Sequence, residues 1–245
     1  MVNLKEFKVD KGLILITMMR RGKFMNRTEG MVLRNKLYKI LKNESIENIK
    51  ELGEKCLNFT NHPELFNDTI LLERLKPVFE TNEFQKLYNE TLKYRDDVIN
   101  RWNFLQPEVK KYFSHILGIN EEKDIVVNIV NPYFNTGTNN MNNEIFWGHY
   151  VGINNPNYDA VYMMHESMHC MFPYKKEWNR QQRGICHSLI ELATDNELMC
   201  RLSGDYKEYN MGHYDGAPIR KKLMPLWCAF LSEKPGRRKS TANTR

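Results

Sequence analysis

The sequence predicts an α+β protein that is mainly helical and contains a small β-sheet. Apolar residues recur at helical spacing through most of residues 28–117, which is typical of packed amphipathic helices. Two short segments, 124–131 and 145–153, are instead rich in β-branched and aromatic residues and indicate strands. Two further apolar helical segments follow, 161–172 and 185–199, and we expect the sheet to pack against the first of them.

This order of elements divides the chain into three regions. We expect a mostly helical N-terminal region at 1–122, a core with C-terminal helices at 123–231, and a basic tail at 232–245. Of the 245 residues, 41% are hydrophobic, and 12 Tyr, 12 Phe and 4 Trp are enough for a sizeable buried core.

The formal net charge of +6 is concentrated in the tail. Residues 232–245 contain five Lys or Arg and one Glu, a net charge of +4, which leaves +2 for the rest of the chain. The tail has no large apolar residue, and no aromatic residue lies among its basic ones. We therefore expect a disordered, solvated end in preference to a nucleic-acid partner, and the alternative is a nucleic-acid-binding regulator that uses this tail.

The apolar run at residues 12–19 is too short to span a bilayer, and no small-residue cleavage site follows it. We expect this run to be a strand, and the protein to be neither secreted nor membrane-spanning. Five cysteines without a CxxC pair argue against a disulfide framework and indicate a cytoplasmic location.

A series of helices is expected between this first strand and the central strands. Their apolar positions and end signals give the segments 28–43, a helix from 45, another from 63, 82–104, and 107–117 closed by Gly118. These helices carry no group of chemically reactive residues, so we assign them to a scaffold and to one wall of a substrate cleft.

The two central strands are connected by a Gly- and Asn-rich segment at 135–143, so we expect them to pair as a hairpin. Because Gly148 and Gly152 have no side chains, one face of the second strand is almost free of side chains, and another backbone could approach it closely. Residues 154–159 then supply a turn and a cap for the next helix.

That helix contains the motif His165-Glu166-x-x-His169. Histidines four residues apart lie on one face of a helix, where both rings can bind one metal ion and the intervening carboxylate can face a water on that ion. Chance alone produces this pentad in about one of sixty chains of such composition, so a third ligand on a nearby element is required.

The expected third ligand is Glu191, within the helical segment 185–199, which Gly204 is expected to end. It lies among aliphatic residues, where an unpaired carboxylate would be costly. Asp195, one turn later on the same face, could accept a hydrogen bond from the free ring N–H of a ligating histidine. The alternative is an amphipathic helix whose two carboxylates face water.

The HExxH motif followed by Glu191-x-x-x-Asp195 resembles the gluzincin group of zinc metallopeptidases, of which thermolysin is a member. The metzincin continuation HExxHxxGxxH is excluded, because Phe172 and Lys175 occupy the positions of its Gly and third His. The resemblance covers residues 124–204 and implies a compact zincin-like catalytic core.

The resemblance also implies roles for individual residues. Glu166 would be the general base, and Asp195 would support a zinc-binding histidine, His165, through a hydrogen bond. The strand at 145–153 would be an edge strand along which an extended substrate lies. The implied ligands of the one zinc ion are His165, His169 and Glu191. The residues implied to contact the substrate are Trp147, Gly148, His149 and Tyr150.

The expected function is therefore that of a zinc-dependent metallopeptidase, which hydrolyses a peptide or protein substrate with a metal-activated water. The donor to the oxyanion is expected at 212–216, from either His213 or Tyr214, and the alternative is an exposed loop without a role. His187, one turn before Glu191, is expected to be a capping or surface residue in preference to a metal-shell residue. The alternative function is a catalytically inactive or structural zinc-binding regulatory domain.

Overall fold

The structure is a computed structural model, which describes residues 2–19, 32, 34–39, 73, 76–130, 132, 137–139, 143–148, 155–205 and 212–234. The protein is mainly helical and its described residues form one four-stranded sheet, which confirms the α+β class. The elements in chain order are β1 (Val2–Lys8), α1 (Lys11–Met19), α6 (Asn82–Lys111), the π-helical turn η2 (Tyr112–Ile116), β2 (Lys123–Ile129), β3 (Gly137–Asn139), β4 (Glu144–Trp147), α7 (Tyr158–Met171), α8 (Arg180–Glu191), the π-helical segment η3 (Leu192–Leu198), α9 (Met199–Ser203), the 3-10 turn η4 (Tyr214–Gly216) and α10 (Ala217–Ser232).

The four strands lie in the order β1-β2-β4-β3. The pairs β1–β2 and β2–β4 are parallel, and β3 is antiparallel to β4. The two central strands are therefore neighbours, as expected, but the expected hairpin is wrong. The connection between them contains β3, which takes the antiparallel place beside β4 and lets β4 run parallel to β2.

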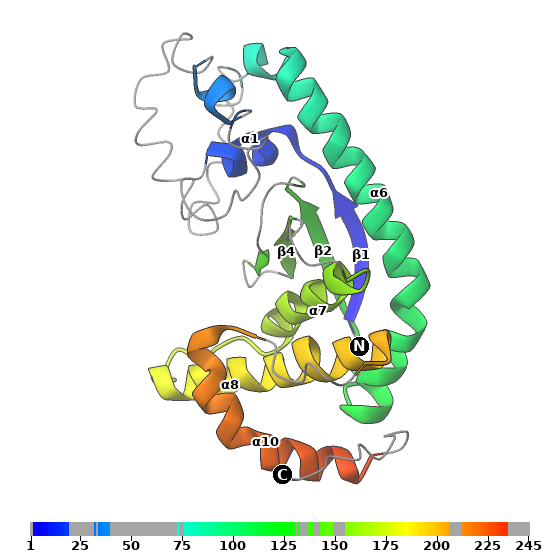
Figure 1. Cartoon of the computed structure of the whole chain (residues 1–245). Coiled ribbons are helices and arrows are strands. Elements are labelled where there is room, and N and C mark those ends of the chain that lie inside the picture. Colours follow the sequence, from blue (N-terminus) through cyan, green and yellow to red (C-terminus); the bar gives the residue numbers. More distant parts are fainter. Residues whose placement is uncertain are drawn as a thin grey trace.

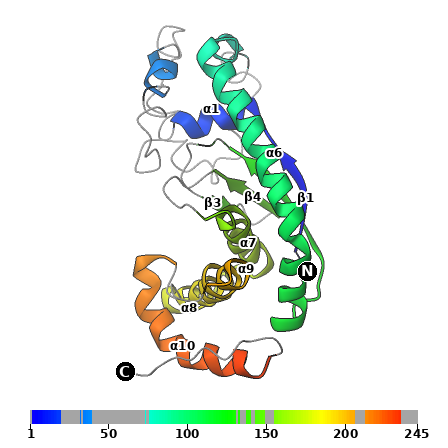
Figure 2. The ribbon, with the colours of Figure 1, turned by 45° about the vertical axis from the view of Figure 1, so that its right-hand side comes forward.

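The expected edge strand also differs from the structure. β4 ends at Trp147 and lies between β2 and β3, so the strand at the end of the described sheet is β3. β3 consists of residues 137–139, from the segment that the sequence indicates as a turn. It lies against α7, which is visible in Figure 2. Of the expected substrate-contacting residues, His149 and Tyr150 lie outside the described part of the chain.

Residues 12–19 belong to helix α1, so the expected strand there is wrong. The Asp10 side chain accepts a hydrogen bond from the Leu13 backbone N–H at 2.7 Å and starts the helix. The helix is apolar around its circumference, because four consecutive residues are all buried, Leu13, Ile14, Leu15 and Ile16. Its sequence therefore shows no helical periodicity of apolar and polar residues that would distinguish it from a buried strand. None of the described helices is both long and apolar enough to cross a membrane.

Helix α6 confirms the expected helix from residue 82 but continues through Pro107, where a new helix was expected. Thr81 caps its first turn by accepting from the Phe84 backbone N–H at 3.3 Å. Leu105 and Val109, on either side of the proline, are both buried, and this continuous apolar face keeps the helix in one piece. Gly118, with φ +71°, closes the turn that follows.

One core joins the N-terminal strand to the rest of the protein. Its buried residues come from β1, α6, the sheet, α7 and η3, and they extend to Leu231 in α10. Figure 1 shows α6 running beside β1, with α7 and α8 on the far side of the sheet from α1. Most of the helices expected at 28–43 and from 45 and 63, and the tail after residue 234, lie outside the described residues.

Candidate metal site

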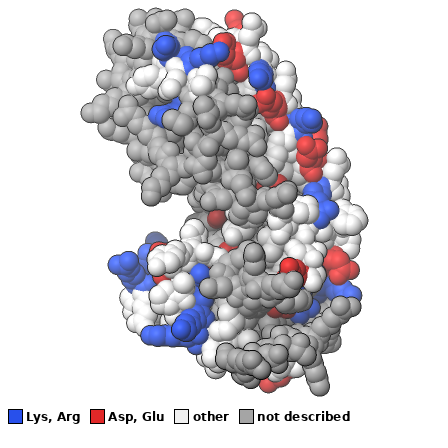
Figure 3. All heavy atoms as spheres, in the orientation of Figure 1, with Lys and Arg blue, Asp and Glu red and all other residues white. Residues whose placement is uncertain are grey.

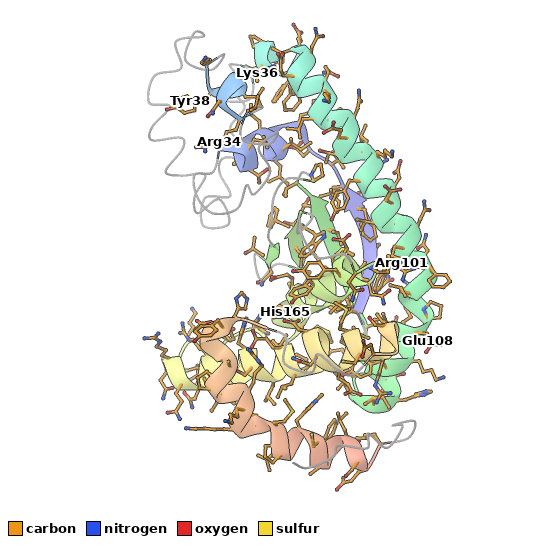
Figure 4. The ribbon with its side chains drawn as sticks, in the orientation of Figure 1. Arg34, Lys36, Tyr38, Arg101, Glu108 and His165 are labelled. Carbon is orange, nitrogen blue, oxygen red and sulfur yellow. The ribbon has the colours of Figure 1, made fainter. Side chains whose placement is uncertain are left out.

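Helix α7 carries the HExxH motif, as predicted, and presents its two histidines to the interior. His165 and His169 are 2% and 5% exposed. The turn before the helix is fixed by α6, because Arg101 donates to the Pro156 carbonyl at 3.1 Å and to the Asn157 side chain. Figure 4 shows the labelled His165 where α7 faces α8. The motif is therefore held by buried structure on both sides.

The second helix of the site runs from α8 through η3 into α9 and ends at Gly204, as the sequence predicts. Asn179 and Gln182 form a capping box at its start. Every residue from 190 to 200 is buried. π-Helical segments often mark functional sites, and here η3 contains Asp195.

Three histidine rings converge between these two helices. The Nε2 atoms of His165 and His169 are 3.2 Å apart, and the Nδ1 atom of His187 lies 3.0 Å from His169 Nε2. A single ring nitrogen makes one good hydrogen bond, so hydrogen bonding does not account for both contacts of His169 Nε2. Two nitrogens bound to one tetrahedral zinc ion at 2.0–2.1 Å lie about 3.3–3.4 Å apart. The cluster could therefore hold a metal ion.

Asp195 makes the predicted contact with His165. Its Oδ1 lies 2.8 Å from His165 Nδ1 and also accepts from the Thr194 hydroxyl at 2.9 Å. Burial lowers the pKa of His165, but the Asp195 carboxylate outweighs burial and raises this pKa to about 9. Burial and the neighbouring His165 and His187 lower the pKa of His169 to about 3. The contact with Asp195 fixes the orientation of the His165 ring, with Nδ1 at the carboxylate and Nε2 facing the cluster.

Glu191 lies beside the cluster, but both of its carboxylate oxygens have other partners. Oε2 accepts from the Arg220 guanidinium, and Oε1 accepts from the His213 backbone N–H. Glu191 is fully buried and Arg220 is 2% exposed. Burial raises the pKa of Glu191, but His187, the His213 N–H and Arg220 together lower it to about 2. The expected zinc ligand is thus already engaged in a buried ion pair.

The loop before α10 closes over this ion pair. Gly212, with φ +127°, adopts a conformation that favours glycine, and a Cβ there would lie 2.7 Å from both Glu191 Cδ and Arg220 Nη1. A Cβ on Gly216 would lie 2.9 Å from Glu191 Oε2 and from Arg220 Nη1. Both glycines are therefore required by the close approach of the loop to the carboxylate.

The two expected oxyanion donors from this loop are separated by the structure. The His213 ring lies 5.1 Å from the His187 ring and 6.4 Å from the His165 ring, measured between centroids. Tyr214 is 96% exposed and faces a cavity along α10, because η4 turns the chain away from the cluster after His213. His213 is near the candidate metal site and Tyr214 is not.

Glu166 is held by the edge strand. Its Oε2 accepts from the Asn139 side-chain amide at 2.9 Å. A Cβ on Gly137 would lie 3.1 Å from Glu166 Cγ and 2.7 Å from the Trp147 ring, so β3 passes directly over both side chains. Trp147 itself is 2% exposed and donates to Asp159 at 2.9 Å, which makes its side chain part of the core and corrects its expected place on a substrate surface. Gly148, which follows, is also buried.

Two residues near the cluster were not foreseen as members of it. The interpretation of His187 as a capping or surface residue is corrected by its contact with His169. The sequence feature that pointed to the cluster was the position of His187 four residues before Glu191, on the same helix face. The Tyr174 hydroxyl lies 3.3 Å from His187 Nδ1. Burial raises the pKa of Tyr174 to about 12, so this hydroxyl is a hydrogen-bond donor at neutral pH.

A cavity of about 770 Å³ opens beside the cluster. Its lining includes Tyr174, His187 and His213 together with the first turns of α8 and the start of α10. Figure 3 shows Lys and Arg side chains gathered on this part of the surface. Arg180 and Arg183 line the cavity and are exposed. A molecule that enters the cavity therefore meets a basic rim and then the histidine cluster.

Comparisons with known proteins found no relative of this chain. No protein-family model, no curated protein and no solved structure matches it. The interpretation of the site consequently rests on its own geometry.

Proposed function

We propose that the protein is a zinc-dependent metallopeptidase. The observation that carries this proposal is the convergence of the His165 and His169 Nε2 atoms at 3.2 Å, on a helix that places Glu166 between them. A structural zinc site is typically closed and rich in cysteine, whereas this cluster has histidine donors, an adjacent carboxylate and a cavity at its side.

Glu166 is the residue that moves protons in this proposal. A zinc ion bound at the cluster would polarise the scissile carbonyl and lower the pKa of a bound water to about 7. Glu166 takes the proton from the attacking water and passes it to the leaving amine. Asn139, which donates to Glu166 Oε2 at 2.9 Å, orients the carboxylate and leaves the other oxygen for this transfer.

The surroundings of the cluster support a peptide as the substrate. The cavity beside His187 is large enough to hold several side chains of a peptide. β3 lies at the end of the described sheet and touches Glu166, so an extended peptide that pairs with β3 would lie across the cluster. His213 and Tyr174 are the side chains from which we expect a hydrogen bond to the oxyanion.

Digestion of a peptide library by the zinc-loaded protein, followed by mass spectrometry, tests the proposal. We expect cleavage by the wild type, a loss of about 10²–10⁴ in rate for Glu166→Gln with unchanged zinc content, and no effect of the matched surface change Glu177→Gln. Removal of zinc by a chelator should abolish cleavage, and added zinc should restore it. Equal turnover by wild type and Glu166→Gln, or no turnover by the zinc-loaded wild type, would contradict the proposal and favour a structural zinc-binding domain.

A further inference from the structure

We propose that His187 is the third protein ligand of the metal ion, and that Glu191 orients His187 and does not bind the ion. The inference rests on the metal of the proposed function, but it changes the donor set from two imidazoles and a carboxylate to three imidazoles. It follows from three features of the described site: the spacing of the ring nitrogens, the partners of Glu191, and the pairing of the outer ring nitrogens of His165 and His187 with carboxylates.

The ring nitrogens have the spacing of ligands that share one ion. His187 Nδ1 is 3.0 Å from His169 Nε2, which is 3.2 Å from His165 Nε2, and one donor atom from each of the three residues lies within 4.8 Å of the others. The edge of a tetrahedron around zinc is about 3.3–3.4 Å for nitrogen ligands. His187 therefore already occupies the position of a third ligand, without any movement of its helix.

Glu191 is held away from this position. Its two oxygens accept from Arg220 and from the His213 backbone N–H. Moving the carboxylate onto the ion would weaken its contact with Arg220, which is buried with its Nε already lacking a hydrogen-bond partner among the described residues. The approach of Gly212 and Gly216 to the carboxylate leaves little room for it to rotate. The two donors and the close glycines thus keep the carboxylate facing Arg220 and the His213 N–H, while its Oε1 lies 3.5 Å from Nε2 of His187, the ring nitrogen that does not contact His169.

The carboxylates of Asp195 and Glu191 instead face the ring nitrogens of His165 and His187 that point away from the cluster. Asp195 faces His165 Nδ1 at 2.8 Å, and Glu191 Oε1 faces His187 Nε2 at 3.5 Å. A metal-binding histidine commonly donates its outer ring N–H to a carboxylate, which fixes the tautomer and orients the ring. In this arrangement His165 binds through Nε2 and His187 binds through Nδ1.

A competing set of donors consists of His187, Glu191 and His213, which also lie within 4.8 Å of one another. This set uses the committed Glu191 carboxylate and the exposed His213 ring, and it excludes the HExxH histidines. The Tyr174 hydroxyl, 3.3 Å from His187 Nδ1, is a hydrogen-bond partner of that nitrogen in the absence of an ion. The set of three histidines is favoured because it includes both HExxH histidines, its neighbouring nitrogens lie 3.0 and 3.2 Å apart, and the outer nitrogens of His165 and His187 face carboxylates.

The number of ligating histidines can be counted in the wild-type protein. With Co²⁺ in place of zinc, each ligating histidine contributes one strongly shifted, exchangeable ring N–H resonance to the proton NMR spectrum in water. We expect three such resonances, and His187→Gln should remove one of them. Two resonances in the wild type would overturn the inference while leaving the metallopeptidase proposal intact. No uptake of Co²⁺ or zinc by the wild type would overturn both.

Zinc affinity, measured by competition with a chromophoric chelator, gives a second readout that does not depend on activity. We expect His187→Gln to weaken zinc binding by at least about 100-fold, Glu191→Gln by about 10-fold, and the matched loop change His213→Ala by less than about 3-fold. A larger loss for Glu191→Gln than for His187→Gln, in variants with unchanged circular dichroism, would assign the third ligand to Glu191 and contradict the inference.

Discussion

Replacing Arg220 with methionine should destabilise the protein strongly at neutral pH. Methionine keeps most of the volume of the side chain but removes the charge that faces Glu191, which is fully buried. Removing one partner of a buried ion pair typically costs about 3–5 kcal/mol, because the remaining charge is left without compensation. The His213 backbone N–H, which still contacts the other carboxylate oxygen, offsets only part of this cost.

Protonation of Glu191 limits the loss of stability caused by Arg220→Met. In the wild type its pKa is lowered from 4.5 to about 2 by His187, the His213 N–H and Arg220, so these contacts together stabilise the fold fully above pH 4.5 and lose this effect as the pH falls toward 2. In the variant the buried carboxyl takes up a proton, which costs about 3 kcal/mol at pH 7 and about 1 kcal/mol at pH 5.5. The destabilisation should therefore be about 3 kcal/mol at pH 7 and should fall as the pH is lowered.

Urea unfolding at the two pH values measures this effect. With a slope of about 2.5–3 kcal/mol/M for a protein of this size, the midpoint should fall by about 1 M at pH 7 and by about 0.5 M at pH 5.5. Lys222→Met, an exposed change on the same helix, should alter the stability by less than about 0.5 kcal/mol. Adding Glu191→Gln to Arg220→Met should recover most of the loss at pH 7. An Arg220→Met variant as stable as the wild type, or an equal loss at both pH values, would refute the buried ion pair.

Three further changes probe the supports of the site. Asp195→Asn should weaken zinc binding about 10–100-fold in chelator competition, because a ligating histidine loses the carboxylate behind it. Gly137→Ala should cost about 1–3 kcal/mol in thermal unfolding, because its Cβ would lie 2.7 Å from ring carbons of Trp147. Asp159→Ala should cost about 2 kcal/mol or more in the same assay, because it leaves two buried donors, including the Trp147 ring N–H, without their acceptor.

Two control variants accompany these changes. Asp215→Asn, in the exposed loop, should leave zinc affinity unchanged, and Asp96→Ala, on the exposed face of α6, should leave stability within about 0.5 kcal/mol of the wild type. Unaltered zinc affinity in Asp195→Asn would remove the supporting role of that carboxylate. Wild-type melting temperatures for Gly137→Ala and Asp159→Ala would show that β3 and the buried hydrogen bonds around Trp147 are looser than the structure indicates.

The two helices of the candidate site could be predicted because their signals are local. The spacing of His165 and His169 fixes a shared helix face, and the apolar run around Glu191 with its terminal Gly204 fixes a second buried helix. The contact between Asp195 and His165 follows from those two faces meeting, and the hydrogen bond is present at 2.8 Å. Side-chain spacing thus anticipates the two buried helix faces, and the resemblance to gluzincins supplies the pairing of Asp195 with His165.

The sheet could not be predicted in the same way, because strand pairing depends on residues far apart in the chain. β1 pairs with β2, where Val2 lies opposite Lys123. β3 has only three residues within a Gly- and Asn-rich segment, too short for a recognisable pattern. Helix α1 is buried on every side, so its apolar run fits a strand as well as a helix.

The partners of Glu191 could not be predicted from the sequence, for a related reason. A buried carboxylate requires a positive partner, and the sequence alone permits a metal ion or an arginine to fill that role. Arg220 lies 29 residues further along the chain, on a helix whose approach depends on how the intervening loop folds. Because of the conformation of the same loop, His213 faces the cluster and Tyr214 faces away from it. Tertiary contacts, and not local propensity, therefore determine which donors remain free to bind a metal ion.

The metal content of the purified protein tests the central claim most directly. Zinc per chain should be determined by mass spectrometry of the elements after dialysis against metal-free buffer, for the wild type and for His169→Ala. The proposed site predicts one tightly bound zinc ion per chain in the wild type and essentially none in the variant. A wild-type protein that binds no zinc, or a His169→Ala variant that retains all of it, would contradict the claim that the HExxH helix holds a metal ion.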